Sequence, residues 1–186
     1  MQETQIVLYM EALGDELVQR GFSIADKIEI LIAGGTYMVM HVHNRASTED
    51  IDVLFLSDHI DLTKLPLSQQ EKAFRAAVKA VAKQFKLKQS WFNDDAGPFL
   101  AEYIPQPQKV YWRDFGPIKA YFPSKEAMLV YKICGYSAKQ QGDVYALAQE
   151  LNLHTYDEVK AVIDALVSKK AQKDFDVEDT IDNLFD

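Results

Sequence analysis

Two aspartates at alternating positions of an apolar segment constrain this chain more than any other feature. The stretch Asp50-Ile51-Asp52-Val53-Leu54 reads as a buried β-strand apart from its two acidic residues. Side chains alternate between the two faces of a strand, so Asp50 and Asp52 are expected to point the same way. Their carboxylates then repel each other unless a cation lies between them, and oxygen ligands suit Mg²⁺ or Mn²⁺. The sequence therefore predicts a metal site held by Asp50 and Asp52.

A pair of glycines precedes these aspartates. Residues 27–33 are mostly apolar, which predicts a largely buried strand, and residues 36–44 are expected to form a short helix. Gly34 and Gly35 separate the two. Glycines in this place let a ligand approach the backbone closely, and free N–H groups at the start of a helix favour phosphate. The same pair is equally consistent with an ordinary turn, and both interpretations stay open.

Hydrophobic periodicity along the chain predicts an α+β fold. A small mixed β-sheet core flanked by helices is expected over residues 1–122, and a helical C-terminal part over 123–186, unless the two form one continuous domain. Helices are expected over 4–20, 36–44, 68–86, from 124, over 143–151 and over 156–168. Strands are expected over 27–33, 51–56, 99–104, 109–112 and 118–122. Residues 90–96 are expected to be an irregular loop, and the acidic tail 174–186 a short amphipathic helix docked on the domain or on a partner.

The net charge of the chain limits the partners that it can bind. A net charge of -8 over 186 residues disfavours a general affinity for nucleic acid or anionic membranes, but it does not exclude an RNA held by a local basic patch. The predicted helix 68–86 has such a basic side, carrying Lys79, Lys83 and Lys86, which is most simply a solvated face. Lys88 follows at its exit.

One cysteine excludes an intrachain disulfide. Cys134 lies in an apolar helical stretch, so a buried thiol in a reducing compartment is expected. Neither a signal peptide nor a membrane-spanning stretch is recognised, which predicts a cytoplasmic protein. His41 and His43 are expected at the surface or the edge of the core, because residues two apart on a helix do not share a face.

The segment from Gly34-Gly35 through Arg45-Ala46-Ser47-Thr48-Glu49-Asp50-Ile51-Asp52 resembles the core motif of the nucleotidyltransferase superfamily with the DNA polymerase β-like fold. More narrowly, it is similar to the branch of AbiEii-type toxins and related bacterial nucleotidyltransferase-like proteins. Ser90-Trp91-Phe92-Asn93-Asp94 is similar to a loop of some members. Pro123 through Lys132 resembles a helix that carries an inward lysine in this family. The resemblance covers residues 27–150.

This resemblance implies metal-dependent transfer of a nucleoside monophosphate from an NTP to an RNA, protein or small-molecule acceptor. It also implies a cognate antitoxin or other protein partner. Asp50 and Asp52 would hold Mg²⁺ or Mn²⁺ and, with Lys132, form the catalytic group. The implied nucleotide-binding residues are Gly34, Gly35, Thr36, Arg45, Thr48 and Asp143.

Several of these residues have a second interpretation. Arg45 is expected either near the phosphates or paired with Glu49 or Asp50, and Lys132 either in the site or exposed. Asp143 is a site residue or the N-cap of the next helix.

Members of the superfamily often have a third carboxylate and a Lys-Asp-x-x-Asp element. Here Glu102 and Asp114 are the candidates for the third carboxylate. In the stretch that corresponds to the Lys-Asp-x-x-Asp element, Gln140 replaces the first aspartate. A nucleotidyltransferase-like protein that binds a nucleotide or a partner without turnover therefore remains the alternative. A helical interaction protein with two solvated aspartates is the third hypothesis.

Overall fold

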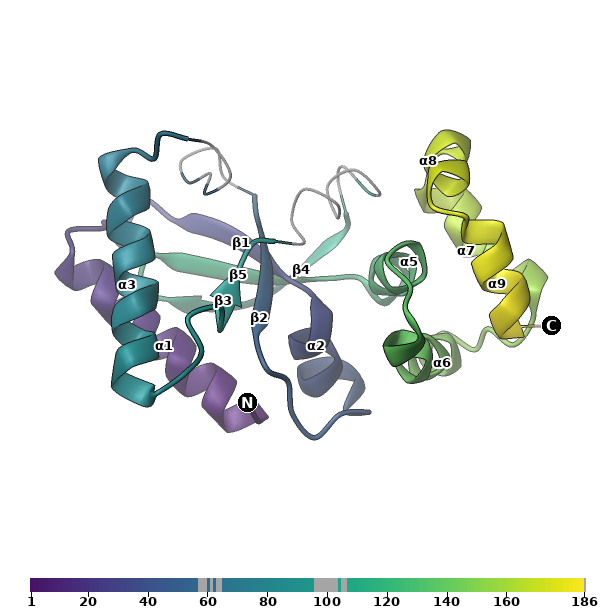
Figure 1. Cartoon of the computed structure of the whole chain (residues 1–186), viewed down its shortest axis with the longest axis horizontal. Coiled ribbons are helices and arrows are strands. Elements are labelled where there is room, and N and C mark those ends of the chain that lie inside the picture. The colour runs from purple at the N-terminus through teal and green to yellow at the C-terminus, as the bar shows by residue number, and fades with distance from the viewer. Residues whose placement is uncertain (57–59, 61, 63–64, 96–103, 105–106, 186) are drawn as a thin grey trace.

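Five short strands pair into one mixed sheet, in the order β3-β2-β1-β5-β4 (Figure 1). The computed structural model describes residues 1–56, 60, 62, 65–95, 104 and 107–185. The strands are β1 (Ile28–Ile32), β2 (Ile51–Phe55), β3 (Phe92–Asn93), β4 (Lys109–Phe115) and β5 (Ile118–Pro123). Pairing is parallel for β1 with β5 and for β2 with β3, and antiparallel for β1 with β2 and β4 with β5. This sheet with its helices confirms the predicted α+β class.

Strand β1 occupies the centre of the sheet because both of its faces are apolar. Ile28, Ile30 and Leu31 are at most 2% exposed, and they pair with β5 on one side and β2 on the other. Strand β2 instead has one buried face, with Ile51 and Val53 fully buried and the intervening residue half-buried. The site described below lies on the opposite, less buried face of β2.

Helices α1 (Glu3–Gln19) and α3 (Gln69–Phe85) pack against each other beside the sheet (Figure 1). Helix α3 begins where predicted, because the Ser68 hydroxyl accepts the Glu71 N–H and the Glu71 carboxylate accepts the Ser68 N–H, at 3.1 and 2.6 Å. Its Phe74 ring contacts Phe55 and Phe92, with centroids 5.4 and 5.8 Å apart.

Helix α1 approaches the turn between β4 and β5 very closely at Gly14. A Cβ at this position would lie 2.6 Å from the backbone oxygen of Phe115. The facing Gly116 has φ of +54°, a left-handed conformation that favours glycine. Two glycines thus allow this contact between helix and turn.

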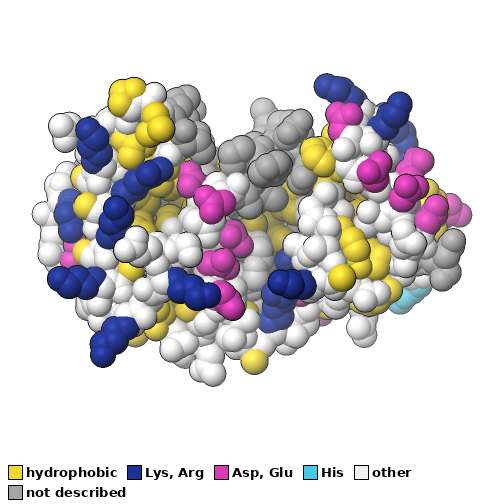
Figure 2. Space-filling model, in the orientation of Figure 1, with side chains coloured by type: hydrophobic (Ala, Val, Ile, Leu, Met, Phe, Trp, Pro, Cys, Tyr) yellow, Lys and Arg dark blue, Asp and Glu magenta, His cyan; other side chains and the backbone are white. Residues whose placement is uncertain are grey.

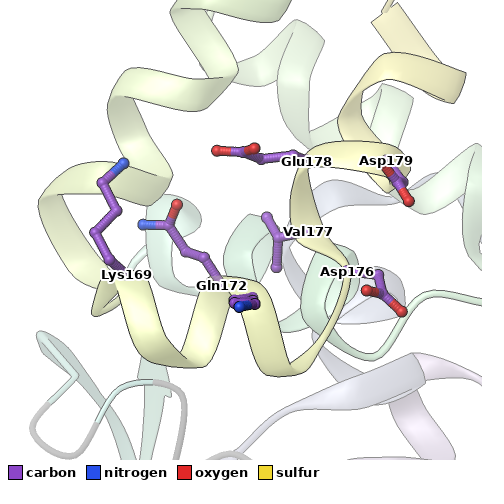
Figure 3. Close-up of a pocket in the computed structure, with 7 residues that line it drawn as sticks. Lys169, Gln172, Asp176, Val177, Glu178 and Asp179 are labelled. Carbon is purple, nitrogen blue, oxygen red and sulfur yellow. The ribbon is translucent and has the colours of Figure 1, made fainter.

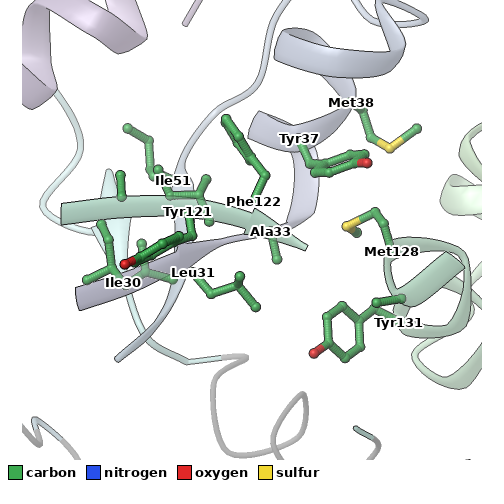
Figure 4. Packing of buried hydrophobic residues seen from close by; sticks show 14 of the residues in the cluster. Ile30, Leu31, Ala33, Tyr37, Met38, Ile51, Tyr121, Phe122, Met128 and Tyr131 are labelled. Atoms are coloured by element: carbon green, nitrogen blue, oxygen red, sulfur yellow. The ribbon is translucent and has the colours of Figure 1, made fainter. Parts of the chain in front are cut away.

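The C-terminal helices lie beyond the end of β5 (Figure 1). Tyr37 and Met38 face Met128 and Tyr131 across this junction, within one continuous core (Figure 4). Cys134 is buried in the same region, as expected. The elements are α5 (Lys125–Cys134), η2 (Ala138–Gln140), α6 (Gln141–Glu150), α7 (Tyr156–Leu166), α8 (Lys169–Asp174) and α9 (Val177–Phe185).

Helix α9 settles the position of the acidic tail. Val177, Ile181 and Leu184 are at most 7% exposed, and α9 contacts α5, α7 and α8. The apolar face of the tail therefore docks on the chain itself. The division of the chain at residue 122 stays a prediction. No helix among the described residues is long and apolar enough to cross a membrane.

Several boundaries differ from the sequence-based expectation. The region 90–96 is not wholly irregular, because Phe92–Asn93 forms β3 by pairing with β2. The helix expected over 156–168 ends at Leu166, and Ser168 caps α8. The strand expected over 99–104 lies outside the described residues, apart from Ile104.

Candidate functional site

Asp50 and Asp52 lie at the start of β2, next to the first turn of α2 (Gly34–Tyr37). The backbone holds them in place. The Asp50 carbonyl accepts the hydroxyl groups of Thr36 and Thr48, at 3.0 and 3.2 Å, and the Asp52 carbonyl accepts the Ala33 N–H at 3.0 Å. Both threonines are buried, so their side chains fix the turn that leads into the strand.

The glycine pair begins the helix rather than preceding it, two residues earlier than predicted. Helix α2 then continues into a π-helical turn, η1 (Met38–Val42). Gly34 has φ of +63°, and a Cβ there would lie 2.1 Å from the Asp52 Oδ2 atom. A Cβ on Gly35 would lie 2.3 Å from the Thr48 hydroxyl oxygen. The glycines are therefore required by close packing, and they bring the Asp52 carboxylate against the helix start.

This environment raises the pKa of Asp52 to about 6. Burial is the main cause, because the half-buried carboxylate loses hydration when charged, and the charge of Asp50 adds to it. A hydrogen bond from the Asn93 side chain and the charge of Lys132 act in the opposite direction, whereas Asp95 raises the pKa further. The protonation of Asp52 therefore depends on the charges of Asp50, Asp95 and Lys132.

Sequence reasoning gave Asn93 and Asp95 no role in the site, although Asn93 lies in the stretch 90–94 that resembles a family loop. Strand β3 places Asn93 directly opposite Asp52 in a parallel register, and Asp95 follows two residues later. The Asp95 N–H donates to the Asn93 side-chain oxygen at 3.2 Å. The available signal was the pair of buried aromatic residues, Trp91 and Phe92, which precedes the polar Asn-Asp-Asp run.

Only one of the two earlier candidates for a third carboxylate lies among the described residues. Asp114 lies on β4, at the opposite edge of the sheet from β3, and pairs with Lys27 at 3.0 Å, so its assignment to the site is wrong. Glu102 lies outside the described residues. Within the described part of the chain, no three His, Cys, Asp or Glu side chains converge closely enough to hold a metal ion. Two carboxylates still fit Mg²⁺, which usually keeps several waters and takes further oxygens from substrate phosphates.

A buried charge cluster lies beside the acidic pair and is centred on Asp143. Arg45 donates to both of its oxygens, from Nε at 2.7 Å and Nη2 at 2.6 Å. Lys132 Nζ lies 2.8 Å from Oδ2, and Asn44 donates to Oδ1 at 3.1 Å. Lys132 is 4% and Asp143 1% exposed. Burial alone would raise the pKa of Asp143, but its bonds with Lys132, Arg45 and Asn44 outweigh this and lower it.

The cluster rules out one interpretation of each of three residues. Arg45 pairs with Asp143 rather than with Glu49 or Asp50, and Glu49 pairs with Lys88. Lys132 is buried rather than exposed. Asp143 is not an N-cap, since α6 starts at Gln141 and the carboxylate is turned toward the other partners. Next to Lys132, the buried Tyr131 hydroxyl has no hydrogen-bond partner among the described residues.

The histidines contribute to packing. The His41 ring stacks on Tyr37 and meets Phe122 edge-on, with centroids 5.1 and 4.3 Å apart. Burial against these rings, helped by the charges of His43 and Lys125, lowers the pKa of His41. His43 ends the π-helical turn with φ of +55° and is exposed.

A separate pocket of about 340 Å³ lies between α8 and the start of α9 (Figure 3). Glu178 points toward Lys169 and Gln172, whereas Asp176 and Asp179 point away. The acids do not converge, so this pocket has no arrangement suited to a cation.

The candidate site is therefore the group around Asp50 and Asp52. The Asp52 carboxylate lies against a glycine-rich helix start with the charge of Asp50 close by, and a buried lysine held by Asp143 lies close enough to lower the pKa of Asp52. Such a group can hold a divalent cation and an anionic ligand together. Comparisons of the chain with protein-family models, with curated proteins and with solved structures found no match.

Proposed function

We propose that this protein is a metal-dependent nucleotidyltransferase. It would move a nucleoside monophosphate from an NTP to an RNA, protein or small-molecule acceptor. The observation that carries the proposal is the contact between Gly34 and the Asp52 carboxylate, beside Asp50. Two acids at a strand start, one of them packed against a helix N-terminus, suit a cation and a phosphate together. The resemblance to the nucleotidyltransferase superfamily and its AbiEii-type branch supports the same function.

The reaction assigns separate tasks to the residues of the chain. An acceptor hydroxyl oxygen bonds to the α-phosphorus, the bond to the β-phosphate oxygen breaks, pyrophosphate leaves, and the hydroxyl proton passes to a base or to solvent. Asp50 and Asp52 would hold Mg²⁺ or Mn²⁺. When bound, the ion would neutralise charge on the phosphates. Lys132 would add a fixed positive charge, oriented by its ion pair with Asp143.

A protein that binds a nucleotide or a partner without turnover is the second candidate. One observation favours it: Asp143 already engages both Arg45 and Lys132, the cations expected to bind a triphosphate. The proposed setting is the cytoplasm, and a cognate antitoxin is the proposed protein partner. Turnover separates the two candidates, because only the transferase releases pyrophosphate.

Thermal unfolding with each NTP, with and without Mg²⁺ or Mn²⁺, tests the site. A ligand that binds only the folded state at about 100 times its Kd adds about 2.7 kcal/mol, a Tm rise of roughly 5–10 °C. The rise should require the metal and disappear in the Asp50→Asn/Asp52→Asn variant.

The matched control is Glu11→Gln/Glu150→Gln, which removes the same charge from two exposed ion pairs. It should keep the full Tm rise. No rise with any NTP in the wild type would exclude the nucleotide site. A rise without release of pyrophosphate, for every acceptor class, would select the second candidate.

A further inference from the structure

The solvent-facing side of α3 forms a basic stripe. It consists of Lys72, Arg75, Lys79, Lys83 and Lys86. Successive members are three or four residues apart, so the four within the helix project from one side of it, and Lys86 follows as the C-cap residue. All five are exposed. This concentration of positive charge stands out in a chain whose net charge is -8.

The lysines of the basic stripe have no counter-charge of their own. Elsewhere in the fold, basic side chains such as Lys27, Lys109 and Lys125 form ion pairs. No ion pair involves the four lysines of the stripe in the described part of the chain, and Arg75 donates to the backbone oxygen of Leu62. Four like charges along one exposed side repel each other, and this repulsion is relieved when an anionic polymer binds.

The stripe leads to the acidic pair. Just past its C-terminal end, Lys88 forms an ion pair with Glu49, the residue before Asp50. This bond raises the pKa of Lys88, and the charge of Asp50 contributes. Figure 2 shows basic side chains over α3 and, beside them, a band of acidic side chains between α3 and the C-terminal helices. A ligand lying along α3 would therefore end at the candidate site.

We propose that the basic stripe of α3 is the docking surface for an acceptor RNA, bound through its phosphates. The inference rests on the proposed function and names the acceptor class. Helix α3 rises about 1.5 Å per residue, so its 17 residues give a straight surface roughly 25 Å long, enough for several consecutive phosphates. Lysines contact phosphates without reading bases, so the binding is independent of sequence.

An acidic protein segment fits this surface less well. Protein interfaces have an apolar or aromatic centre with a polar rim. The exposed large apolar side chains of the described residues, such as Leu8, Val110 and Tyr111, do not lie on α3. The surface therefore offers charge without an apolar centre, which is the pattern of phosphate recognition.

Fluorescence anisotropy with a labelled oligouridine of about 16 nucleotides tests the docking surface, without NTP and with a chelator present. The test variant is Lys72→Gln/Lys79→Gln/Lys83→Gln, since glutamine has nearly the helix propensity of lysine. Its affinity should fall at least about tenfold, and its slope of log K against log salt should shrink by about 2, from three lost phosphate contacts.

The matched control is Lys169→Gln/Lys170→Gln/Lys173→Gln on α8, which removes the same charge from another exposed helix. Its affinity should stay within about twofold of the wild type. Equal losses in both variants would reduce the effect to net charge and overturn the proposal, as would an unchanged affinity in the α3 variant. Circular dichroism of both variants checks that they are folded.

Two further arms identify the ligand and separate the two proposals. An oligoglutamate of equal charge should bind more weakly than the RNA; equal binding that depends on the same lysines would assign α3 to an acidic protein instead. The Asp50→Asn/Asp52→Asn variant should bind RNA at least as well as the wild type. RNA binding without an NTP-induced Tm rise would contradict the proposed function alone. An NTP-induced Tm rise without RNA binding would contradict the docking surface alone.

Discussion

The carboxyl group of Asp52 is strongly perturbed. Its pKa in the folded protein is about 6, against an ordinary value of 3.8, so the folded state binds the extra proton between these values. Stability therefore falls as the pH rises through this range. Asp52→Asn should remove the loss and stabilise the protein by about 1–3 kcal/mol above pH 6, with little gain below pH 4.

Denaturant unfolding across this pH range measures the effect. Asp15→Asn, an exposed aspartate on α1 without an ion pair among the described residues, serves as the control and should change stability by less than about 0.5 kcal/mol at every pH. A gain for Asp52→Asn that does not vary with pH would show that charge is not its cause.

Asp143 has the opposite effect on stability. Its pKa is lowered, so its contribution is present at neutral pH and is lost as the pH falls through the lowered value. Asp143→Asn leaves the buried Lys132 without its carboxylate and should cost about 3–5 kcal/mol at pH 7, measured by urea unfolding.

The exposed Lys125–Glu150 pair provides the comparison. Glu150→Gln should cost far less than Asp143→Asn, because solvent screens both partners. Similar costs for the two variants would mean that the Asp143 cluster does not act as a buried ion pair.

At the scale of elements, α1 packs closely against the β4–β5 turn because the two facing residues are glycines without side chains. Gly14→Ala places a methyl group 2.6 Å from the Phe115 oxygen, a rigid backbone atom. Overpacking of this kind should cost about 1–3 kcal/mol in thermal unfolding.

Gly142→Ala is the matched control, since a Cβ there meets nothing within 4 Å. In helix α6 this change should be neutral or stabilise the protein by up to about 1 kcal/mol. Equal destabilisation by both changes would point to a general effect of replacing glycine rather than to the close contact.

Elements with their own sequence pattern were predictable. Apolar spacing located α1 and α3, and the helices expected from residues 68 and 156 begin at Gln69 and Tyr156, directly after the N-cap residues Ser68 and Thr155. Strand β3 was missed because two residues carry no period; only the pairing with β2 makes them a strand. Similarly, the glycine turn and the acidic pair were recognised locally, but their contact depends on the fold.

The Asp143 cluster shows what local reasoning cannot reach. Arg45 and Asp143 are 98 positions apart, and their pairing requires α6 to pack beside η1. From sequence, Arg45 has nearer acidic neighbours in Glu49 and Asp50. The long-range partner is preferred in the fold because it is buried and presents both oxygens to the guanidinium group.

At the scale of the whole molecule, this cluster links the sheet to the C-terminal helices. Trp91 and Trp112 both report on the sheet region, whereas far-UV circular dichroism reports largely on helices. We expect the two signals to follow the same unfolding transition, because separating the parts would break the Arg45–Asp143 pair and leave Arg45 without its partner.

Ile181→Ala, in the fully buried face of α9, should lower both transitions together, with a cost of about 2–5 kcal/mol. A dichroism transition that moves while the tryptophan transition stays would establish two independently folding parts, divided near residue 122.

Cys134, the single cysteine of the chain, can report on local opening of the protein. Burial on α5 raises the pKa of Cys134 to about 12, so at neutral pH the group is both protonated and shielded from reagents. A thiol reagent can therefore react only when the core around Cys134 opens and exposes this residue. The rate of modification measures how often the protein opens next to Lys132, without a label or a substitution.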